Sequence, residues 1–194
     1  MNLALITIAI VLAAAPSSNT QTTAQNPAPT PSPTTDTALA DAQRLLDTDQ
    51  PEAAAKILAR WPEEGPPAPA ELRFDVAHAL ATADSPALDA AALLFEQAAQ
   101  QANHPRTPSA LARDAAANLG RVHFEAVKPP AAGPNAVAEL EKVADQLWRA
   151  ERAYRAALDI DPNDTDAMRS LEIVRRRLAD LLNQAEQAQQ QQQQ

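Results

Sequence analysis

The sequence contains no cysteine, 3 glycines and only 3% aromatic residues. Without cysteine, disulfide bonds and thiolate catalysis are excluded. Three glycines also make a glycine-rich phosphate-binding loop hard to build, because such a loop brings the backbone close to its ligand. These absences remove two common kinds of catalytic or cofactor site.

Basic residues are scarce as well. The 16 Lys and Arg are outnumbered by 25 Asp and Glu, so the net charge is -9. Nucleic-acid binding that is independent of sequence relies on Lys and Arg to neutralise phosphates. We therefore expect no nucleic-acid partner, and an anionic membrane surface is disfavoured for the same reason.

Alanine is abundant, with 46 copies among 194 residues, and apolar residues make up 45% of the chain. Alanine favours helices, whereas β-branched and aromatic residues favour strands. The length allows one domain plus extensions. We expect an all-α protein.

The N-terminal residues resemble an export signal. Residues 3–15 form an apolar run of thirteen residues, the length of a signal-peptide core and too short to span a bilayer comfortably. We expect export to the periplasm or cell envelope. Residues 1–15 would then be a signal peptide or, alternatively, a retained membrane anchor.

A linker is expected to follow. Residues 16–36 contain five prolines and few bulky apolar side chains, so this segment cannot bury enough surface to offset the entropy of ordering. We predict a disordered linker here, then a helical domain over 37–182 and a Gln-rich tail over 183–194 that frays in solvent.

Within the domain, the apolar spacing and the Pro, Asp and Asn breaks predict seven helices. The ranges are about 37–47, 51–61, 70–83, 85 onward with Ser85 as cap, 107–127 with Thr107 as cap, 135–160 and 165–182. The strongest inward-facing stripe belongs to the sixth helix: Leu140, Val143, Leu147, Ala150, Tyr154 and Ala157. Burial is also predicted for Leu39, Ala42 and Leu46 in the first helix and for Met168, Leu171, Val174, Leu178 and Leu181 in the seventh.

One pattern of small and aromatic residues occurs twice. The fourth helix carries Ala91, Phe95 and Ala98, and the sixth carries Ala150, Tyr154 and Ala157 with Pro162 following. Small side chains let helices approach closely, the aromatic ring fills the gap, and proline ends the helix. This pattern resembles the second helix of a tetratricopeptide (TPR) repeat, and the pair Leu119 and Gly120 resembles part of a first helix.

The TPR resemblance implies an α-solenoid of about three helical hairpins plus a C-terminal capping helix. The ending "AYRAALDIDPNDTDAMRSLEIVRRRLADLL" and its Gln-rich tail are similar to the ends of TPR proteins encoded in bacterial aerotolerance (Bat) operons. In that family, exported or membrane-anchored repeat domains are thought to assist von Willebrand A-type membrane proteins. The resemblance therefore implies such proteins as partners.

No residue pattern points to a reaction. The sequence has no G-x-S-x-G motif and no His-Cys pair, and His78, His104 and His123 lack the spacing of a metal-binding pair. The acids around Asp161 resemble the start of a calcium loop, but Asp164 and Ser170 occupy the positions that need Gly and Glu. We interpret these acids as helix caps and predict no catalytic residue, metal or cofactor.

Two surface features stay ambiguous. The basic run Arg175 to Arg177 is a solvated face that pairs with Glu172 and Asp180, or a site for an anionic partner segment. Trp61 and Trp148 fill the core or form a binding hot spot.

The sequence thus predicts a non-catalytic scaffold that binds another protein. In a TPR-type groove lined by first helices, the candidate contact residues are Arg73, His78, Asn118 and His123. One alternative is a structural envelope protein that oligomerises through its two long C-terminal helices. Another is an enzyme or metal binder, which would require His78, His123 and a carboxylate to converge within about 5 Å.

Overall fold

A computed structural model describes residues 34–61, 66–104, 107–130 and 136–192. All of them belong to one unit of the chain, Ser32–Gln194. The expected signal or anchor at 1–15 and residues 16–33 of the expected linker 16–36 lie outside the described residues. The end of the predicted linker is wrong, because Thr35 and Asp36 already belong to the first helix, where the Thr34 hydroxyl caps its start.

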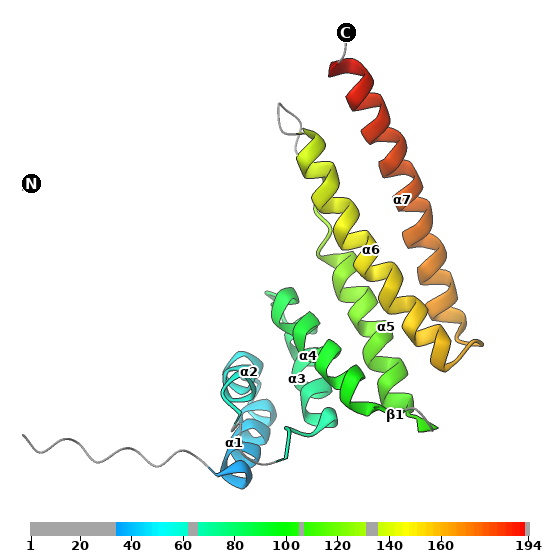
Figure 1. Cartoon of the computed structure of the whole chain (residues 1–194). Helices are drawn as coiled ribbons and strands as arrows, with labels where there is room; N and C mark the ends of the chain where they lie inside the picture. Colours follow the sequence, from blue (N-terminus) through cyan, green and yellow to red (C-terminus); the bar gives the residue numbers. More distant parts are fainter. Residues whose placement is uncertain (1–33, 62–65, 105–106, 131–135, 193–194) are drawn as a thin grey trace, which may run out of the picture. The chain divides into compact units, whose positions relative to one another are not determined.

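The described residues form helices joined by short connections (Figure 1). They are α1 (Thr35–Asp47), α2 (Pro51–Ala59), α3 (Ala70–Thr82), α4 (Leu88–Ala102), α5 (Ala110–Glu125), α6 (Ala136–Ile160) and α7 (Thr165–Gln192). Two strands of two residues each, β1 (Asn103–His104) and β2 (Thr107–Pro108), pair antiparallel between α4 and α5. The prediction of an all-α fold is confirmed for this part of the chain.

Two predicted helix starts are too early. The backbone N–H of Ala87 donates to the Leu80 carbonyl (3.1 Å), which holds the preceding residues in a loop, so α4 begins at Leu88. Thr107 lies in β2, and Ser109 is the residue that caps α5, with its hydroxyl accepting from the Ala112 N–H at 3.1 Å.

The helices pack in chain order. Each helix contacts the next one, from α1 with α2 to α6 with α7, and α6 and α7 run antiparallel side by side (Figure 1). In addition, α1 contacts α3, α3 contacts α5, and α5 contacts α7. The odd-numbered helices therefore form a continuous row.

Two groups of buried side chains hold these helices together. The first is centred on α3 and α4, where the buried ring of Phe95 meets Phe74 edge to face with ring centroids 5.5 Å apart. The second joins α5, α6 and α7 and includes Leu147, Tyr154 and Val174. Because each group draws on three or more helices, a helix cannot move without opening contacts to several others.

The predicted stripe of α6 is confirmed, since all six of its residues are buried. In α7 the predictions hold for Leu171, Val174, Leu178 and Leu181 but are wrong for Met168, which is exposed while Ala167 is buried. In α1, Leu39 is likewise exposed and its neighbour Ala38 is buried. In both helices two adjacent positions fit the spacing of the buried stripe. The prediction chose the larger and more hydrophobic side chain, but the neighbouring alanine is the one that faces the core.

The last helix is longer than the sequence predicted. Its regular turns continue past Leu182 to Gln192, through most of the Gln-rich segment. Glutamine is a good helix former, and half-buried Ala185 still packs against the core group of α5 to α7. Residue 182 is therefore not a helix end.

Gly120 and Tyr154 fix the distance between α5 and α6. Gly120 is buried in α5, and a Cβ atom added there would lie 2.9 Å from Cγ, Cδ2 and Cε2 of the buried Tyr154 ring. Real Cβ atoms do not approach a ring this closely, so any larger residue would force the ring to move. The bare backbone of Gly120 allows the two helices to meet.

We predict that Gly120→Ala lowers the free energy of unfolding. Overpacking costs about 1–3 kcal/mol, and the upper part of this range applies because three atoms of a buried ring lie 2.9 Å from the new Cβ. This cost exceeds the gain of about 1 kcal/mol from replacing glycine in a helix. Urea unfolding monitored by circular dichroism measures the change. In a Tyr154→Leu background the ring is absent, so the same substitution should be neutral or stabilising. Equal destabilisation in both backgrounds would disprove the contact.

Candidate binding groove

The row of odd-numbered helices contains a hollow of about 440 Å³. Its walls come from α1, α3 and α5, and the lining residues include Leu46, Phe74, Asp75, His78, Asp114 and Asn118. Leu46 and Phe74 are half-buried and supply apolar surface, while Asp75 and His78 are exposed. The hollow therefore combines an apolar floor with polar groups that can fix the orientation of a bound segment.

A second hollow adjoins the first. It has a volume of about 600 Å³ and lies between α5, α7 and the turn that joins α6 to α7. Asp114, Ala117 and Asn118 line both hollows. We call the combined surface the odd-helix groove, because it follows α1, α3, α5 and α7.

The side chains at the centre of this groove are held in place. His78 stacks on Phe74, with ring centroids 6.3 Å apart and planes inclined by 10°. The Asn118 amide donates to the Asp114 carbonyl (2.9 Å), and its oxygen accepts from Arg121 (3.3 Å). Although the Asp75 side chain is exposed, the surrounding groove residues remove part of its hydration, and this desolvation raises its pKa above the usual value. The groove is thus largely formed before any partner arrives.

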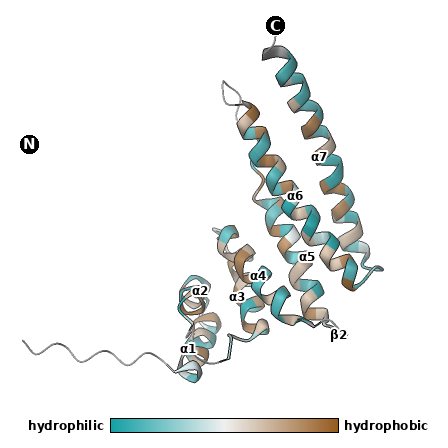
Figure 2. Ribbon diagram, in the orientation of Figure 1, coloured by the Kyte–Doolittle hydropathy of each residue, from teal (hydrophilic) through white to brown (hydrophobic). Residues whose placement is uncertain are grey.

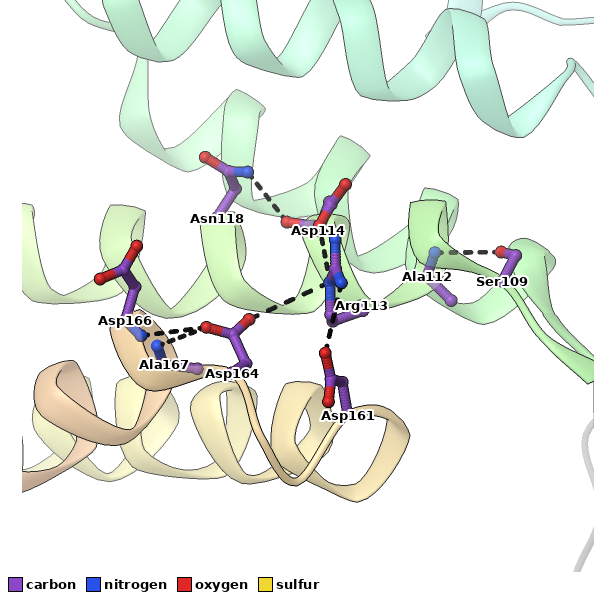
Figure 3. A network of polar contacts seen from close by, with 9 residues as sticks. All are labelled: Ser109, Ala112, Arg113, Asp114, Asn118, Asp161, Asp164, Asp166 and Ala167. Carbon is purple, nitrogen blue, oxygen red and sulfur yellow. Dashed lines mark hydrogen bonds and ion pairs between the residues drawn. The ribbon is translucent and has the colours of Figure 1, made fainter.

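Arg113 ties the groove to the turn between α6 and α7 (Figure 3). Its guanidinium lies 2.6 Å from Asp114, 3.4 Å from Asp161 and 4.0 Å from Asp164. The hydrogen bond with Asp114 is the largest cause of a raised pKa for Arg113, and the nearby acids act in the same direction. The side chain therefore remains charged.

The acids of this turn cap α7. Oδ1 of Asp164 accepts from the backbone N–H groups of Ala167 (2.9 Å) and Asp166 (3.1 Å), as Figure 3 shows. Oδ1 of Asp161 accepts from the N–H of Asn163 at 3.0 Å. This geometry matches the interpretation of the acidic cluster as a helix stop followed by helix caps.

The structure separates the four predicted groove residues. His78 and Asn118 line the same hollow, but Arg73 and His123 do not. Arg73 points to α4, where its Nη1 donates to Gln101 Oε1 at 2.6 Å, and burial lowers its pKa. His123 lines a different hollow of about 670 Å³ between α4, α5 and α6.

Helix geometry explains this separation. Arg73 precedes His78 by five residues, as Asn118 precedes His123, and five residues turn a helix by about 140° beyond a full turn. Residues at this spacing cannot share a face. A search for residues three or four apart would have selected Phe74 with His78 in α3, and Asp114 with Ala117 and Asn118 in α5. Of these groove residues, only His78 and Asn118 are predicted from the sequence.

The residues proposed for the metal-binding alternative do not converge. His78 and His123 line different hollows, and the described residues contain no group of three or more His, Cys, Asp or Glu placed to hold a metal ion. The side chain of His104 lies outside what the structure describes.

The basic run of α7 is engaged within the chain. Arg175 donates to Glu151 (3.1 Å), Arg176 donates to Glu172 (2.9 Å), and the Arg177 guanidinium lies 5.7 Å from the centre of the Phe124 ring. Of the two tryptophans, Trp61 is half-buried and donates to the Pro66 carbonyl (3.1 Å), whereas Trp148 is exposed.

None of the helices in the described part of the chain has the length and apolar character to cross a bilayer. Comparison with protein-family models, with curated proteins and with solved structures finds no match to this chain.

We predict that Asp164→Ala destabilises the fold by about 0.5–2 kcal/mol, the usual cost of losing a helix N-cap. Asp159→Ala is the matched control, because this nearby acid is exposed and has no side-chain bond to the described residues; its effect should stay within about 0.5 kcal/mol. Urea unfolding at pH 7 distinguishes the two. Equal losses of unfolding free energy in the two variants would mean that the removal of a negative charge, and not of the helix cap, causes the effect.

We also predict that His123 makes stability depend on pH. Burial lowers its pKa in the folded state, so below the unfolded value of about 6.5 the unfolded chain binds the proton more readily. Stability that is present above this pH is lost as the pH falls toward the folded pKa. His123→Gln should therefore lose less stability between pH 7 and pH 5 than the natural chain, in unfolding measured across this range. An equal loss of stability in His123→Gln and in the natural chain would disprove this prediction.

Proposed function

We propose that this protein is a non-catalytic scaffold that binds an extended segment or a helix of another protein in the odd-helix groove. The observation that carries the proposal is the continuous row of α1, α3, α5 and α7, along which two adjoining hollows of about 440 Å³ and 600 Å³ lie. Such a surface can recognise a chain through shape and polar contacts without a reaction.

The order of packing supports a TPR-like solenoid. Three successive pairs, α1 with α2, α3 with α4, and α5 with α6, are followed by the single helix α7, and the first helices of these pairs contact one another. Stacked helix pairs of this kind leave one face lined by first helices. The close contact between Gly120 and Tyr154 supports the same proposal, because it joins two positions of the repeat-like pattern.

The dimensions of the groove suit a short peptide or one helix. Packed helices lie about 8–10 Å apart, so the three intervals from α1 to α7 span about 24–30 Å. An extended segment of about seven to nine residues would cross this distance. Its apolar side chains would contact Leu46 and Phe74, and its polar groups would meet Asp75, His78 and Asp114.

We place this binding activity in the cell envelope. The apolar run at residues 3–15 supports export or N-terminal anchoring. The resemblance of the C-terminal sequence to TPR proteins of aerotolerance operons supports von Willebrand A-type membrane proteins as partners.

The test is affinity capture from detergent-solubilised membranes with the full chain as bait, followed by identification of the retained proteins and measurement of their affinity. Ala117→Arg would place a long side chain between the two hollows and should weaken binding at least about 10-fold. His78→Glu should act in the same direction; this side chain is exposed, so folding is preserved.

Leu93→Arg is the matched control, because Leu93 is exposed on α4 and lines the hollow that contains His123, not the groove. It should bind as the natural chain does. Circular dichroism of each variant checks that it is folded. Recovery of general chaperones alone, or equal binding by all variants, would refute the proposal.

A further inference from the structure

One side of α7, bordered by α6, carries a line of exposed residues. We call Met168, Glu172, Arg175, Ala179 and Leu182 the outer stripe. They recur at steps of three and four, so they share one side of the helix, and all five are exposed. Figure 2 shows hydrophobic positions at intervals along α7. None of the five lines the odd-helix groove.

The apolar members of the outer stripe are open to solvent. Met168 is 44% exposed and Leu182 is 49% exposed. On the adjoining helix α6, Trp148 is 43% exposed. It precedes Glu151 by one helical turn, and Glu151 bonds to Arg175 of the stripe. Exposed apolar side chains that recur along one side of a helix can contact a partner.

The charge at the middle of this surface is unbalanced. Glu151 is buried, and the same oxygen, Oε1, accepts from Arg155 at 2.9 Å and from Arg175 at 3.1 Å. Two guanidinium groups thus share one carboxylate, and both remain at least half exposed. A carboxylate supplied from outside would balance the excess positive charge.

We propose that the outer stripe binds the outer stripe of a second copy of this chain, with the two α7 helices antiparallel about a two-fold axis near Arg175. The sequence of the stripe is almost symmetric about this residue. Met168 and Leu182 lie seven residues before and after it, so each faces the other across the axis. Both ends of the interface then bury apolar surface.

The polar residues also match across the axis. Glu172 lies three residues before Arg175, and Ala179 lies four residues after it. Glu172 of one copy therefore lies between Ala179 and Arg175 of the other. The small alanine leaves space for the glutamate side chain, and the guanidinium of Arg175 can pair with its carboxylate. Among the described residues of one chain, Glu172 pairs only with Arg176, and both side chains are more than 70% exposed. Such a pair contributes about 0–1 kcal/mol, so Glu172 can exchange it at little cost.

This self-complementarity selects a second copy over other occupants. The matching surface needs an apolar residue at each end and an acid near the centre at these spacings. A second copy running in the opposite direction has this arrangement, whereas an unrelated helix would have it only by chance. The dimer would leave the odd-helix groove free and would present two grooves in one particle. It makes specific the sequence-based alternative of oligomerisation through the long C-terminal helices.

The first test is sedimentation equilibrium of the full chain over a range of concentrations. The natural chain should form a dimer, and Leu182→Arg should weaken dimerisation at least about 10-fold. Ile173→Arg is the matched control: Ile173 is on the same helix and is also 49% exposed, but it borders Pro129 and Pro130 on a different side. It should leave the dimer intact. A monomer up to about 100 µM, or equal weakening by both variants, would overturn the proposal.

The second test fixes the register, and it is direct because the chain has no cysteine of its own. A mixture of the single variants Met168→Cys and Leu182→Cys should form a disulfide-linked dimer on mild oxidation. Neither variant alone should do so, since identical positions would lie about 21 Å apart along the helix, beyond the roughly 7 Å that a disulfide allows. Cross-linking of Met168→Cys with itself, or no cross-link in the mixture, would contradict the antiparallel arrangement.

Discussion

The arrangement of the C-terminal half depends on the contact between Gly120 and the ring of Tyr154. The ring occupies the space that any Cβ at position 120 would need. The backbone of α5 at Gly120 therefore contacts the Tyr154 ring of α6 directly. The same ring belongs to the buried group that receives α7, which includes Leu171 and Val174. Because protein interiors are dense and resist compression, the position of one helix constrains the positions of the helices packed against it. Once α5 and α6 are fixed, the surface against which α7 packs is fixed as well.

A polar link completes what this contact begins. Arg113 at the start of α5 reaches Asp161 and Asp164 at the turn between α6 and α7, and Asp164 caps the helix that begins there. Apolar contacts set how closely the three helices pack, but they leave freedom of sliding, since they have little direction. Hydrogen bonds and ion pairs at one end remove that freedom. The groove between α5 and α7 lies directly beside this link, so its shape is set by residues that also hold the fold.

Two sides of the molecule therefore carry different chemistry. The odd-helix groove offers half-buried apolar side chains bordered by acids and one histidine. The outer stripe of α7 offers exposed apolar side chains around an excess of guanidinium groups. If both surfaces are occupied as proposed, a dimer would display two peptide-binding grooves, and a partner with two binding segments would be held more tightly than either segment alone.

The sequence by itself determined the helical class, the inward stripe of α6 and the capping role of the acids near Asp164. These properties depend on spacing and composition within one helix or one turn, where the physics is local. Only the tertiary structure decided that Ala167 and not Met168 is buried, that His78 shares a hollow with Asn118 but not with His123, and that Arg113 meets Asp161, 48 residues further along the chain. Each of these depends on how far one helix is rotated and how closely it approaches its neighbours, and a one-dimensional pattern does not contain that angle or that distance.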